Sequence, residues 1–412
     1  MISRRDFIKH LGLMALPVFT GCGGGGSSGG TAGTAEDGDT LTSSQQDAGS
    51  LPDRRNVLVS LHLGGGNDFL NTFVSAETYG RYRDVRPTIG LDAEQGELVE
   101  LSSTMMMRSD MSEGFLDAWQ SGELALVHGV GYENQNFSHF SSADHWHNAS
   151  SPGEDVHKGW LAQLFMDRAA QHERPLIEAI VLDGDLGPTK GLDSTTLVSF
   201  DPASYLRSSV SGVSSSTAAM EHVAEIMSAR EAIYRELSLK ARQDDGVQFP
   251  NTSIGRQLEQ AAHMIRAGVS ADVIKVSQTG FDTHADQLPT QARLWSEISA
   301  AVAAFRQSLI MSGDWNRVIL SSYAEFGRRP LENGTRGTDH GSSSTHFLMG
   351  GKIRGGEYGE YPNLDLATDV TYNFRAAVDF RSIYRTLANR WFDIGDNFLD
   401  RAGSYEILDF LA

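Results

Sequence analysis

The fold is decided by the stretch Val57-Leu58-Val59-Ser60-Leu61-His62-Leu63 and by the residues that follow it, Gly64-Gly65-Gly66-Asn67-Asp68. A short run of leucines and β-branched residues is typical of a strand that is buried on both faces of a sheet. Glycines followed by polar side chains are typical of the turn after such a strand. In open α/β sheets ligands bind beyond the carboxyl ends of the strands. The stretch therefore predicts the kind of sheet and the edge at which a site is expected.

Four further runs have the same character and predict strands at residues 124–127, 179–182, 273–276 and 318–322. Residues 253–267 and 290–311 place apolar side chains at spacings of three and four, which predicts amphipathic helices. Strands that alternate with helices predict an α/β sandwich with a largely parallel sheet.

The first residues of the chain predict export. Ser3-Arg4-Arg5-Asp6-Phe7-Ile8-Lys9 has the pattern of a twin-arginine signal, and an apolar run over 11–20 follows it. That run is too short to span a bilayer, so residues 1–22 are predicted to be a signal peptide with a lipobox-like cleavage site. The twin-arginine export machinery, which carries folded proteins, is then a partner, and a metal or cofactor loaded before export is a common reason for this route.

Cys22 is the only cysteine of the chain and is predicted to be lipidated. The alternative is a stray cysteine in a signal peptide that is cleaved elsewhere. Residues 23–53 are rich in Gly, Ser, Thr and Asp, which predicts a disordered tether. Residues 54–412 are predicted to form a single domain. The protein is then expected in the periplasm or cell envelope, with a lipid anchor as its only contact with the membrane.

The charge of the chain excludes one class of partner. Its 412 residues include 34 Lys and Arg and 53 Asp and Glu, a net charge of −19. The signal peptide contributes Arg4, Arg5 and Lys9 against Asp6, a net +2, so the remainder is near −21. Such a field repels nucleic acid, which excludes nucleic-acid binding. It also opposes an anionic substrate unless a local cation compensates.

Side chains able to do chemistry follow four of the predicted strands, beside glycines. Each group by itself has an ordinary explanation as a turn, a helix cap or a solvated charge cluster, but together they converge on one edge of the sheet. Asp, Glu and His suit zinc, manganese, magnesium or calcium, and the lack of thiolates excludes a cysteine-type zinc site. The residues are Asp68 after the first strand, Ser138 and His139 after the second, Asp282 and His284 after 273–276, and Glu325, Arg328, Asp339 and His340 after 318–322.

Other catalytic motifs are missing or misplaced. A Gly-x-Ser-x-Gly pattern occurs at Gly25-Gly26-Ser27-Ser28-Gly29, but it lies in the predicted tether and follows no strand. The sequence has no His-Glu-x-x-His and no phosphate loop of the Gly-x-x-x-x-Gly-Lys type.

Seven segments, in this order, resemble the bacterial family known as domain of unknown function 1501. The resemblance runs from about Arg54 to the end of the chain. The segments are 61–72 (LHLGGGNDFLNT), 128–140 (HGVGYENQNFSHF), 281–287 (FDTHADQ), 324–329 (AEFGRR), 337–341 (GTDHG), 350–356 (GGKIRGG) and 380–391.

That family is itself similar to the alkaline phosphatase and sulfatase superfamily, and the resemblance implies a three-layer α/β/α sandwich with a largely parallel mixed central sheet. It implies that Asp68 binds metal and that Ser138 is the nucleophile, with Asn71, Thr72 and His139 as alternative catalytic groups. Arg328 or Arg329 would bind the anionic substrate, or else pair with nearby glutamates. Residues implied to complete one or two metal sites are Asp282, His284, Glu325, Asp339, His340 and also His346.

Two departures from the phosphatase pattern stand out. Asp282 and His284 are two residues apart, where that pattern has a wider spacing, and Glu325 stands where an Asp-His pair is expected.

Three functions are compatible with the sequence. The first is an envelope-anchored, metal-dependent hydrolase of phosphate or sulfate esters, acting on a small anionic ester. The second is a non-catalytic envelope lipoprotein of the same fold that binds a surface glycan or a protein partner. The third is a metal-free serine esterase.

Overall fold

The computed structural model describes residues 55–169, 177–192, 196–198, 245–269, 271–399 and 405–411. These residues all belong to one compact unit, Ser50–Ala412. The predicted signal peptide, the predicted lipidation site Cys22 and the predicted tether lie outside the described residues. A helix of the length and apolarity needed to cross a membrane is not found in the described part of the chain.

The central sheet has nine strands within the described residues, in the order β13-β5-β12-β9-β1-β8-β6-β7, with β14 paired to β5. All pairs are parallel except those that β12 makes with β5 and β9. The predicted strands and the largely parallel mixed sheet are thereby confirmed. The strands are β1 (Val57–Gly64), β5 (Leu124–Gly131), β6 (Ala179–Val181), β7 (Thr196–Val198), β8 (Val273–Thr279), β9 (Val318–Tyr323), β12 (Ser343–Met349), β13 (Gly356–Gly359) and β14 (Val378–Asp379).

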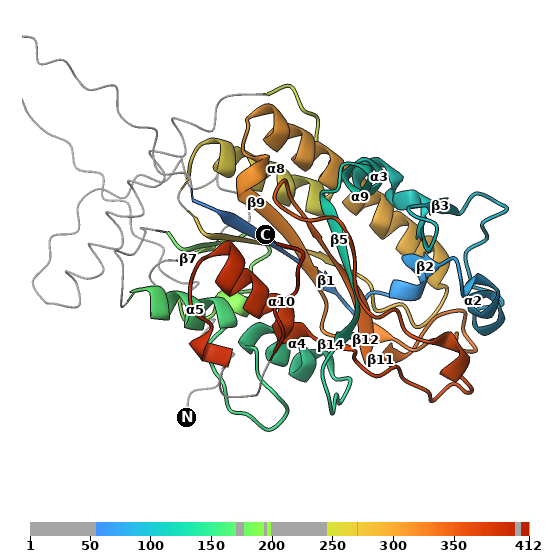
Figure 1. Ribbon diagram of the computed structural model, residues 1–412. Coiled ribbons are helices and arrows are strands. Elements are labelled where there is room, and N and C mark those ends of the chain that lie inside the picture. Colours follow the sequence, from blue (N-terminus) through green and yellow to red (C-terminus); the bar gives the residue numbers. More distant parts are fainter. Residues whose placement is uncertain are drawn as a thin grey trace, which may run out of the picture. The chain divides into compact units, whose positions relative to one another are not determined.

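Helices cover both faces of the sheet, as Figure 1 shows, and the predicted three-layer sandwich is confirmed. The helices predicted at 253–267 and 290–311 are both present, and the second begins three residues earlier than predicted. One face carries α3 (Ser112–Gln120), α8 (Ser253–Arg266) and α9 (Gln287–Met311), and the other carries α4 (His139–Asn148), α5 (Trp160–Ala169) and α10 (Phe380–Thr386).

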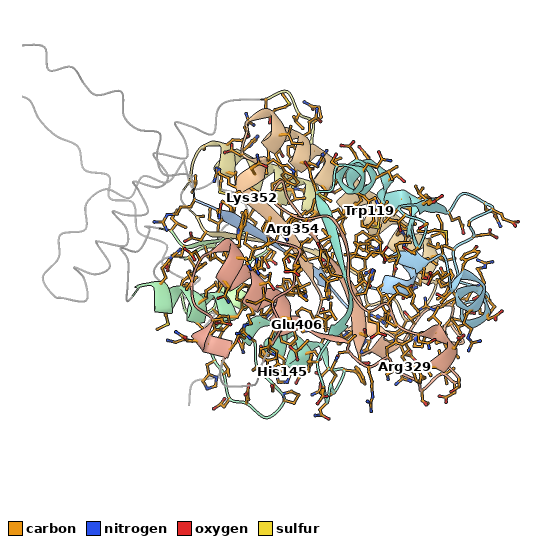
Figure 2. The ribbon with its side chains drawn as sticks, in the orientation of Figure 1. Trp119, His145, Arg329, Lys352, Arg354 and Glu406 are labelled. Atoms are coloured by element: carbon orange, nitrogen blue, oxygen red, sulfur yellow. The ribbon has the colours of Figure 1, made fainter. Side chains whose placement is uncertain are left out.

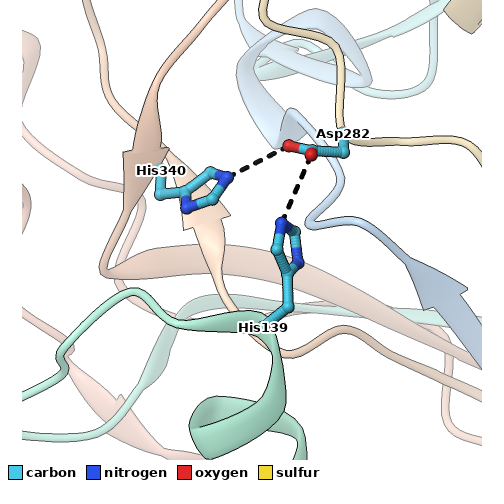
Figure 3. Close-up of side chains that lie close together, drawn as sticks. All are labelled: His139, Asp282 and His340. Carbon is cyan, nitrogen blue, oxygen red and sulfur yellow. Dashed lines mark hydrogen bonds and ion pairs between the residues drawn. The ribbon is translucent and has the colours of Figure 1, made fainter.

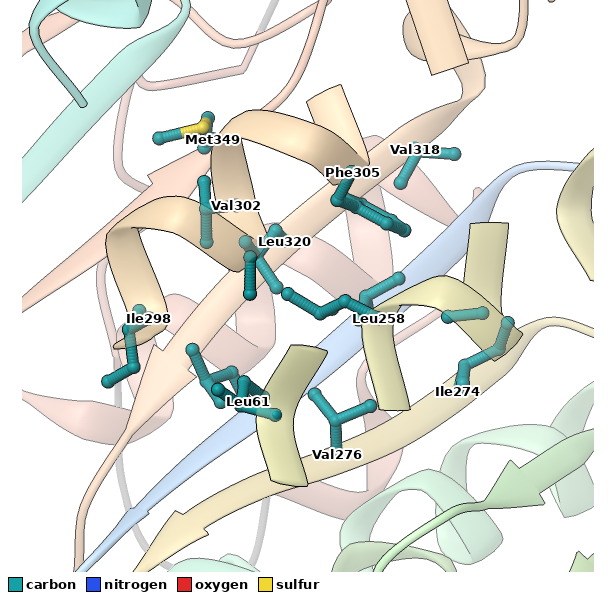
Figure 4. Close-up of a cluster of buried hydrophobic side chains, with 14 of the residues drawn as sticks. Leu61, Leu258, Ile274, Val276, Ile298, Val302, Phe305, Val318, Leu320 and Met349 are labelled. Atoms are coloured by element: carbon teal, nitrogen blue, oxygen red, sulfur yellow. The ribbon is translucent and has the colours of Figure 1, made fainter. Parts of the chain in front are cut away.

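Alternate residues of each strand pack against the α8 and α9 side of the sheet. Leu61, Val276 and Leu320 are fully buried there, and Figure 4 shows them facing Leu258 of α8 and Ile298 of α9. Burying such a side chain contributes about 1.5–3 kcal/mol. Buried apolar side chains form one cluster on each face of the sheet, so the sheet is packed from both sides. Figure 2 draws the side chains on the ribbon.

The opposite face of the same strands is partly polar. Ser60 and His62 of β1 alternate with the apolar residues of the core, and Ser60 pairs with Lys275 while His62 pairs with Tyr323. Side chains of paired residues in a sheet lie on the same face. The four residues Ser60, His62, Lys275 and Tyr323 therefore form a polar stripe across the sheet, beneath α4.

The remaining elements extend the edge at which the strands end. The two-stranded ribbon of β10 and β11 places Arg328 opposite His340. A small antiparallel sheet, β2-β4-β3, packs with α2 beside the first turn after β1. The bounds are α2 (Tyr79–Val85), β2 (Phe73–Ser75), β3 (Leu98–Glu100), β4 (Met105–Arg108), β10 (Gly327–Arg328) and β11 (His340–Gly341), with the short turns η1 (Phe69–Asn71) and η3 (Gly187–Thr189).

Candidate metal centre

The direction of the strands brings the candidate residues to one edge. β1, β5, β8 and β9 run the same way, so their carboxyl ends meet there. β12 runs the opposite way and begins at that edge, which brings His340, just before it, to the same place. His139 arrives from the first turn of α4, after β5.

Asp282 is the centre of the group. The Nε2 atoms of His284 and His340 each lie 3.0 Å from its Oδ1. The Nε2 atom of His139 lies 3.3 Å from its Oδ2. Figure 3 shows the side chains of His139 and His340 pointing toward Asp282 from two separate segments of the chain. Three imidazoles thus turn the same ring nitrogen toward one carboxylate.

The other ring nitrogen of each histidine is already next to an oxygen acceptor. His139 Nδ1 lies 2.7 Å from Glu325 Oε1. His340 Nδ1 lies 2.9 Å from the carbonyl oxygen of Phe137, and His284 Nδ1 lies 3.2 Å from Asp339 Oδ1. An acceptor at Nδ1 fixes the ring and leaves the lone pair of a neutral imidazole on Nε2, as in histidines that bind metals.

The contacts of these rings outnumber the N–H bonds of neutral imidazoles. A neutral imidazole carries one N–H, yet each of the three rings has an oxygen acceptor at both nitrogens. Burial lowers the pKa of His340, although the hydrogen bonds of Asp282 and Phe137 oppose the shift, so this ring favours the neutral form. A cation held by the Nε2 atoms and Asp282 would resolve this mismatch.

The geometry fits such a cation. One ligand atom from each of His139, Asp282 and His340 lies within 4.8 Å of the other two. His284 Nε2 is 3.0 Å from His340 Nε2 and so borders the same space. Two imidazole nitrogens and one carboxylate oxygen, with His284 at the border as a candidate fourth donor, are ligand types that zinc accepts in tetrahedral coordination, and other transition metals also accept them.

Arg328 positions Asp282 instead of facing a substrate. Its side chain is fully buried, and its Nη2 donates to Asp282 Oδ1 at 2.7 Å. Nε and Nη1 donate at 2.8 Å to the carbonyls of Gly66 and Thr338. Burial raises the pKa of Asp282, but hydrogen bonds from Arg328 and His340 outweigh it and hold that pKa well below its usual value. The predicted substrate-binding role of Arg328 has no support in these contacts, because the side chain is fully buried and donates to protein oxygens.

Glu325 lies behind the ligands. Its Oε1 accepts from the backbone N–H of Gly65 at 2.9 Å as well as from His139, and its Oε2 lies 3.2 Å from His62 Nε2. Burial raises the pKa of Glu325, but its hydrogen bonds with His62 and His139 lower that pKa to about 2. Through these contacts Glu325 supports His139, and its ligand role stays a prediction from the sequence. Asp339 supports His284 in the same way.

Asp68 lies apart from the group. Its carboxylate is fully buried in an ion pair with Arg86, at 2.5 Å and 3.0 Å to the two Nη atoms. Gln287 donates to the same carboxylate. The structure therefore places Asp68 in the core beneath η1, where the counterion is a guanidinium, and does not bring it to the predicted metal site. The alternative catalytic groups Asn71 and Thr72 are buried in the same region.

Ser138 stands at the edge of the group. It is exposed and directly precedes α4. Its hydroxyl makes no capping hydrogen bond to the helix. The preceding residue, Phe137, has φ 56°, a left-handed conformation that costs about 1–3 kcal/mol in a residue with a side chain. The contact between the Phe137 carbonyl and His340 holds this turn in place.

His346, which the resemblance implies as a further ligand, is buried under α4 beside Trp146, with ring centroids 5.1 Å apart. Neither of its ring nitrogens has a hydrogen-bond partner within the described residues. Burial lowers its pKa to about 3. The structure does not bring it into the group around Asp282.

His346 makes the fold sensitive to acid. A histidine that is neutral when folded and has an ordinary pKa near 6.5 when unfolded stabilises the fold fully above pH 6.5, and this contribution is lost as the pH falls toward 3. We expect wild-type protein to lose roughly 3 kcal/mol more than His346→Leu between pH 7 and pH 4. Urea unfolding at the two pH values measures the difference. His157→Leu, at an exposed histidine, is the control, and equal losses in all three proteins would contradict the expectation.

The sequence prediction missed a second group next to the first. His62, Lys275 and Tyr323 of the polar stripe meet His147 of α4 and the turn after β6. Lys275 is fully buried, and its Nζ lies 2.5 Å from Asp183 and 3.3 Å from Asp185. The signal was present as polar residues at every second position of otherwise apolar strands, which a reading of each strand as one continuous run overlooks.

Comparison with known proteins defines a family. A family model described as "Protein of unknown function (DUF1501)" matches residues 122–398, a range that contains β5, His139, Asp282 and His340. No curated protein matches the chain. The solved structure "Crystal structure of Ps i-CgsB in complex with k-i-k-neocarrahexaose" is 10% identical and is covered to 71%, with 81% of this chain covered and a TM-score of 0.37. A likeness of that degree carries no argument, so the relation to alkaline phosphatases and sulfatases stays a prediction. Because the matched range exceeds half of its length, the chain belongs to the DUF1501 family of proteins of unknown function.

Proposed function

We propose that this protein is a metal-dependent hydrolase of phosphate or sulfate esters. The supporting observation is the convergence of three Nε2 atoms on Asp282, with each Nδ1 already facing an oxygen acceptor. A divalent cation bound there would supply a Lewis acid for an ester oxygen. His139, His284, His340 and Asp282 would hold it.

The net negative charge around Asp282 favours binding of a cation, and an anionic substrate would bind only after that cation is in place. Asp282, Glu325 and Asp339 contribute −3 and Arg328 contributes +1, a sum of −2 for these four residues. A divalent cation cancels that sum. An anionic ester can then approach a protein whose net charge is −19.

Ser138 is the proposed nucleophile. Its exposed hydroxyl lies next to His139 and is free of the capping role that a serine usually takes at this position. Its oxygen bonds to phosphorus or sulfur as the bond from that atom to the alcohol or phenol oxygen of the substrate breaks, and the proton of Ser138 is released to solvent. The backbone N–H groups in the first turn of α4 stabilise the negative charge of the transferred group. Water then cleaves the ester of Ser138.

The test uses the full chain, purified after export and then loaded with zinc or manganese. We expect about one ion per chain and turnover of p-nitrophenyl phosphate or p-nitrophenyl sulfate that is lost with a chelator and restored by the ion. Full turnover by chelator-treated, metal-free protein would favour the serine esterase and overturn the proposal. An ion without turnover would favour the non-catalytic protein that binds a glycan or a protein partner.

We also propose that the domain acts at the cell envelope, exported by the twin-arginine route and tethered through lipidated Cys22. The sequence of residues 1–22 supports this proposal. In fractionated cells, Cys22→Ala should move the protein from membranes to the soluble periplasmic fraction. Retention of the variant in the membrane fraction would count against the anchor.

A further inference from the structure

Glu325 connects the proposed cation ligands to an imidazole outside them. One of its oxygens faces His139 Nδ1, and the other lies 3.2 Å from Nε2 of His62. His62 makes no contact with Asp282, His284 or His340 in the described structure. A carboxylate that is shared in this way orients two histidines at once, and only one of them belongs to the ligand set.

The ring of His62 is held firmly. It stacks on Tyr323 with centroids 4.7 Å apart and planes at 13°. His147 of α4 meets it edge-on at 6.0 Å, and the Tyr323 hydroxyl lies 3.2 Å from His147 Nε2. With Glu325 at Nε2, these contacts leave the ring one orientation.

That orientation leaves Nδ1 of His62 open. The described residues offer it no hydrogen-bond partner, and the side chain keeps 15% of its surface exposed. Gly64 lies beside it, at the carboxyl end of β1, and a Cβ atom at Gly64 would come within 3.7 Å of Nδ1. Because Gly64 has no side chain, it leaves this side of the His62 ring uncovered at the edge of the sheet that carries the proposed cation site.

We propose that His62 is the general acid that protonates the leaving group, an inference that rests on the proposed function. The Nδ1–H bond of the His62 imidazolium breaks as an O–H bond forms on the leaving oxygen. The electron pair of the cleaved P–O or S–O bond becomes a lone pair of that oxygen, which departs as an alcohol or phenol. Neutral His62 keeps its proton on Nε2, toward Glu325, and regains one at Nδ1 from the water that cleaves the ester of Ser138.

The other groups that face His62 do not suit this role. Burial raises the pKa of Tyr323 well above its usual value. Burial lowers the pKa of His147 to about 3, although Asp185 opposes the shift. Lys275 is held by Asp183 and Asp185. Tyr323, His147 and Lys275 are also buried, whereas the His62 side chain keeps 15% of its surface exposed and lies against Glu325 through Nε2. Of these four described side chains, His62 is therefore the proton donor best placed to meet solvent and substrate.

The test is the dependence of the rate on the leaving group, measured with metal-loaded protein. Phenolate is a basic leaving group and needs a proton, whereas p-nitrophenolate does not. The substrate is phenyl phosphate or phenyl sulfate, according to which class of ester the wild type hydrolyses. With that substrate we expect kcat of His62→Asn to fall about 10²–10³-fold. For the p-nitrophenyl ester the fall should be less than about tenfold, and the ion content should equal that of the wild type.

Two further variants keep the test decisive. Gly64→Ala, which covers Nδ1 and leaves every polar group in place, should show the same difference between the two esters in a weaker form. His157→Asn, at an exposed histidine, should match the wild type. Three results for His62→Asn would overturn the inference if the wild type is active: the same rates as the wild type, equal losses of rate with both esters, or loss of the ion. Absence of turnover in the wild type would overturn the proposed function and the inference together.

Discussion

Asp282→Asn should abolish stoichiometric cation binding and lower turnover by at least about 10³-fold, which corresponds to roughly 4 kcal/mol. Asp282 is the one carboxylate that all three Nε2 atoms face. Asparagine keeps the shape and still accepts a hydrogen bond from Arg328, so the fold is preserved. It removes the negative charge that Asp282 would bring to the four proposed ligands, and an amide oxygen is a much weaker ligand than a carboxylate.

Bound metal per chain, measured after dialysis, and kcat with p-nitrophenyl esters check this expectation. Asp286→Asn is the matched control, because Asp286 lies four residues further along, is exposed and pairs with Arg336 outside the group. That variant should keep its ion and its rate. An Asp282→Asn protein with a full complement of metal would show that the cation lies elsewhere.

Asp68→Ala should destabilise the fold by about 3–5 kcal/mol. Arg86 is fully buried, and its Nη1 and Nη2 both contact Asp68. Without that carboxylate a guanidinium stays buried with no counterion, and Gln287 loses its acceptor. Folded Asp68→Ala protein should nevertheless retain its ion, because Asp68 has no contact with the proposed ligands.

Urea unfolding measures the stability, and metal analysis of the folded variant measures the ion. Glu297→Ala is the control, because it breaks an exposed pair with Arg293 on α9; such pairs contribute less than about 1 kcal/mol. A variant with unchanged stability that has lost its metal would reinstate Asp68 as a ligand, as the resemblance implies.

The fold follows from the sequence where local pattern and burial agree. β1, β8 and β9 are mainly apolar because helices cover them on both faces, and this composition identifies them even though polar residues interrupt each run. β12 was not predicted. Its seven residues, Ser343–Met349, include Ser, Thr and His, and its antiparallel direction depends on partners more than 200 residues away in β5. Long-range pairing of this kind leaves no local signal.

The candidate site follows from the sequence only in part. Asp282, His284 and His340 were placed at one edge because parallel strands end together. The same rule placed Asp68 at this edge. In the structure, however, the turn after β1 leads into the core, where Asp68 pairs with Arg86. Gly65 has φ 113° and packs so tightly that a Cβ atom there would lie 2.3 Å from the backbone nitrogen of Asp282. Because the turn after β1 passes so close to the turn after β8, the residues that follow Gly65 enter the core. The local sequence gives no sign of this contact.

Arg328 was predicted to bind the substrate. Its position, like that of Asp68, depends on contacts between distant segments that the local sequence does not reveal. An arginine after a strand end reads equally well as a ligand for an anion or as a structural group. Only the carbonyls around it decide, and they come from turns that are far apart in the chain. His62 shows the reverse case, a functional candidate inside a strand whose apolar neighbours concealed it.

The bonds of Arg328 have a consequence for selectivity. One guanidinium joins the turn after β1, the turn after β8 and the segment before β11 through the carbonyls of Gly66, Phe281 and Thr338. Three segments that share one guanidinium keep their relative positions. The space between the proposed ligands then cannot widen for a larger ion or narrow around a smaller one. Discrimination among ions would then come from radius and preferred bond angle rather than from charge alone.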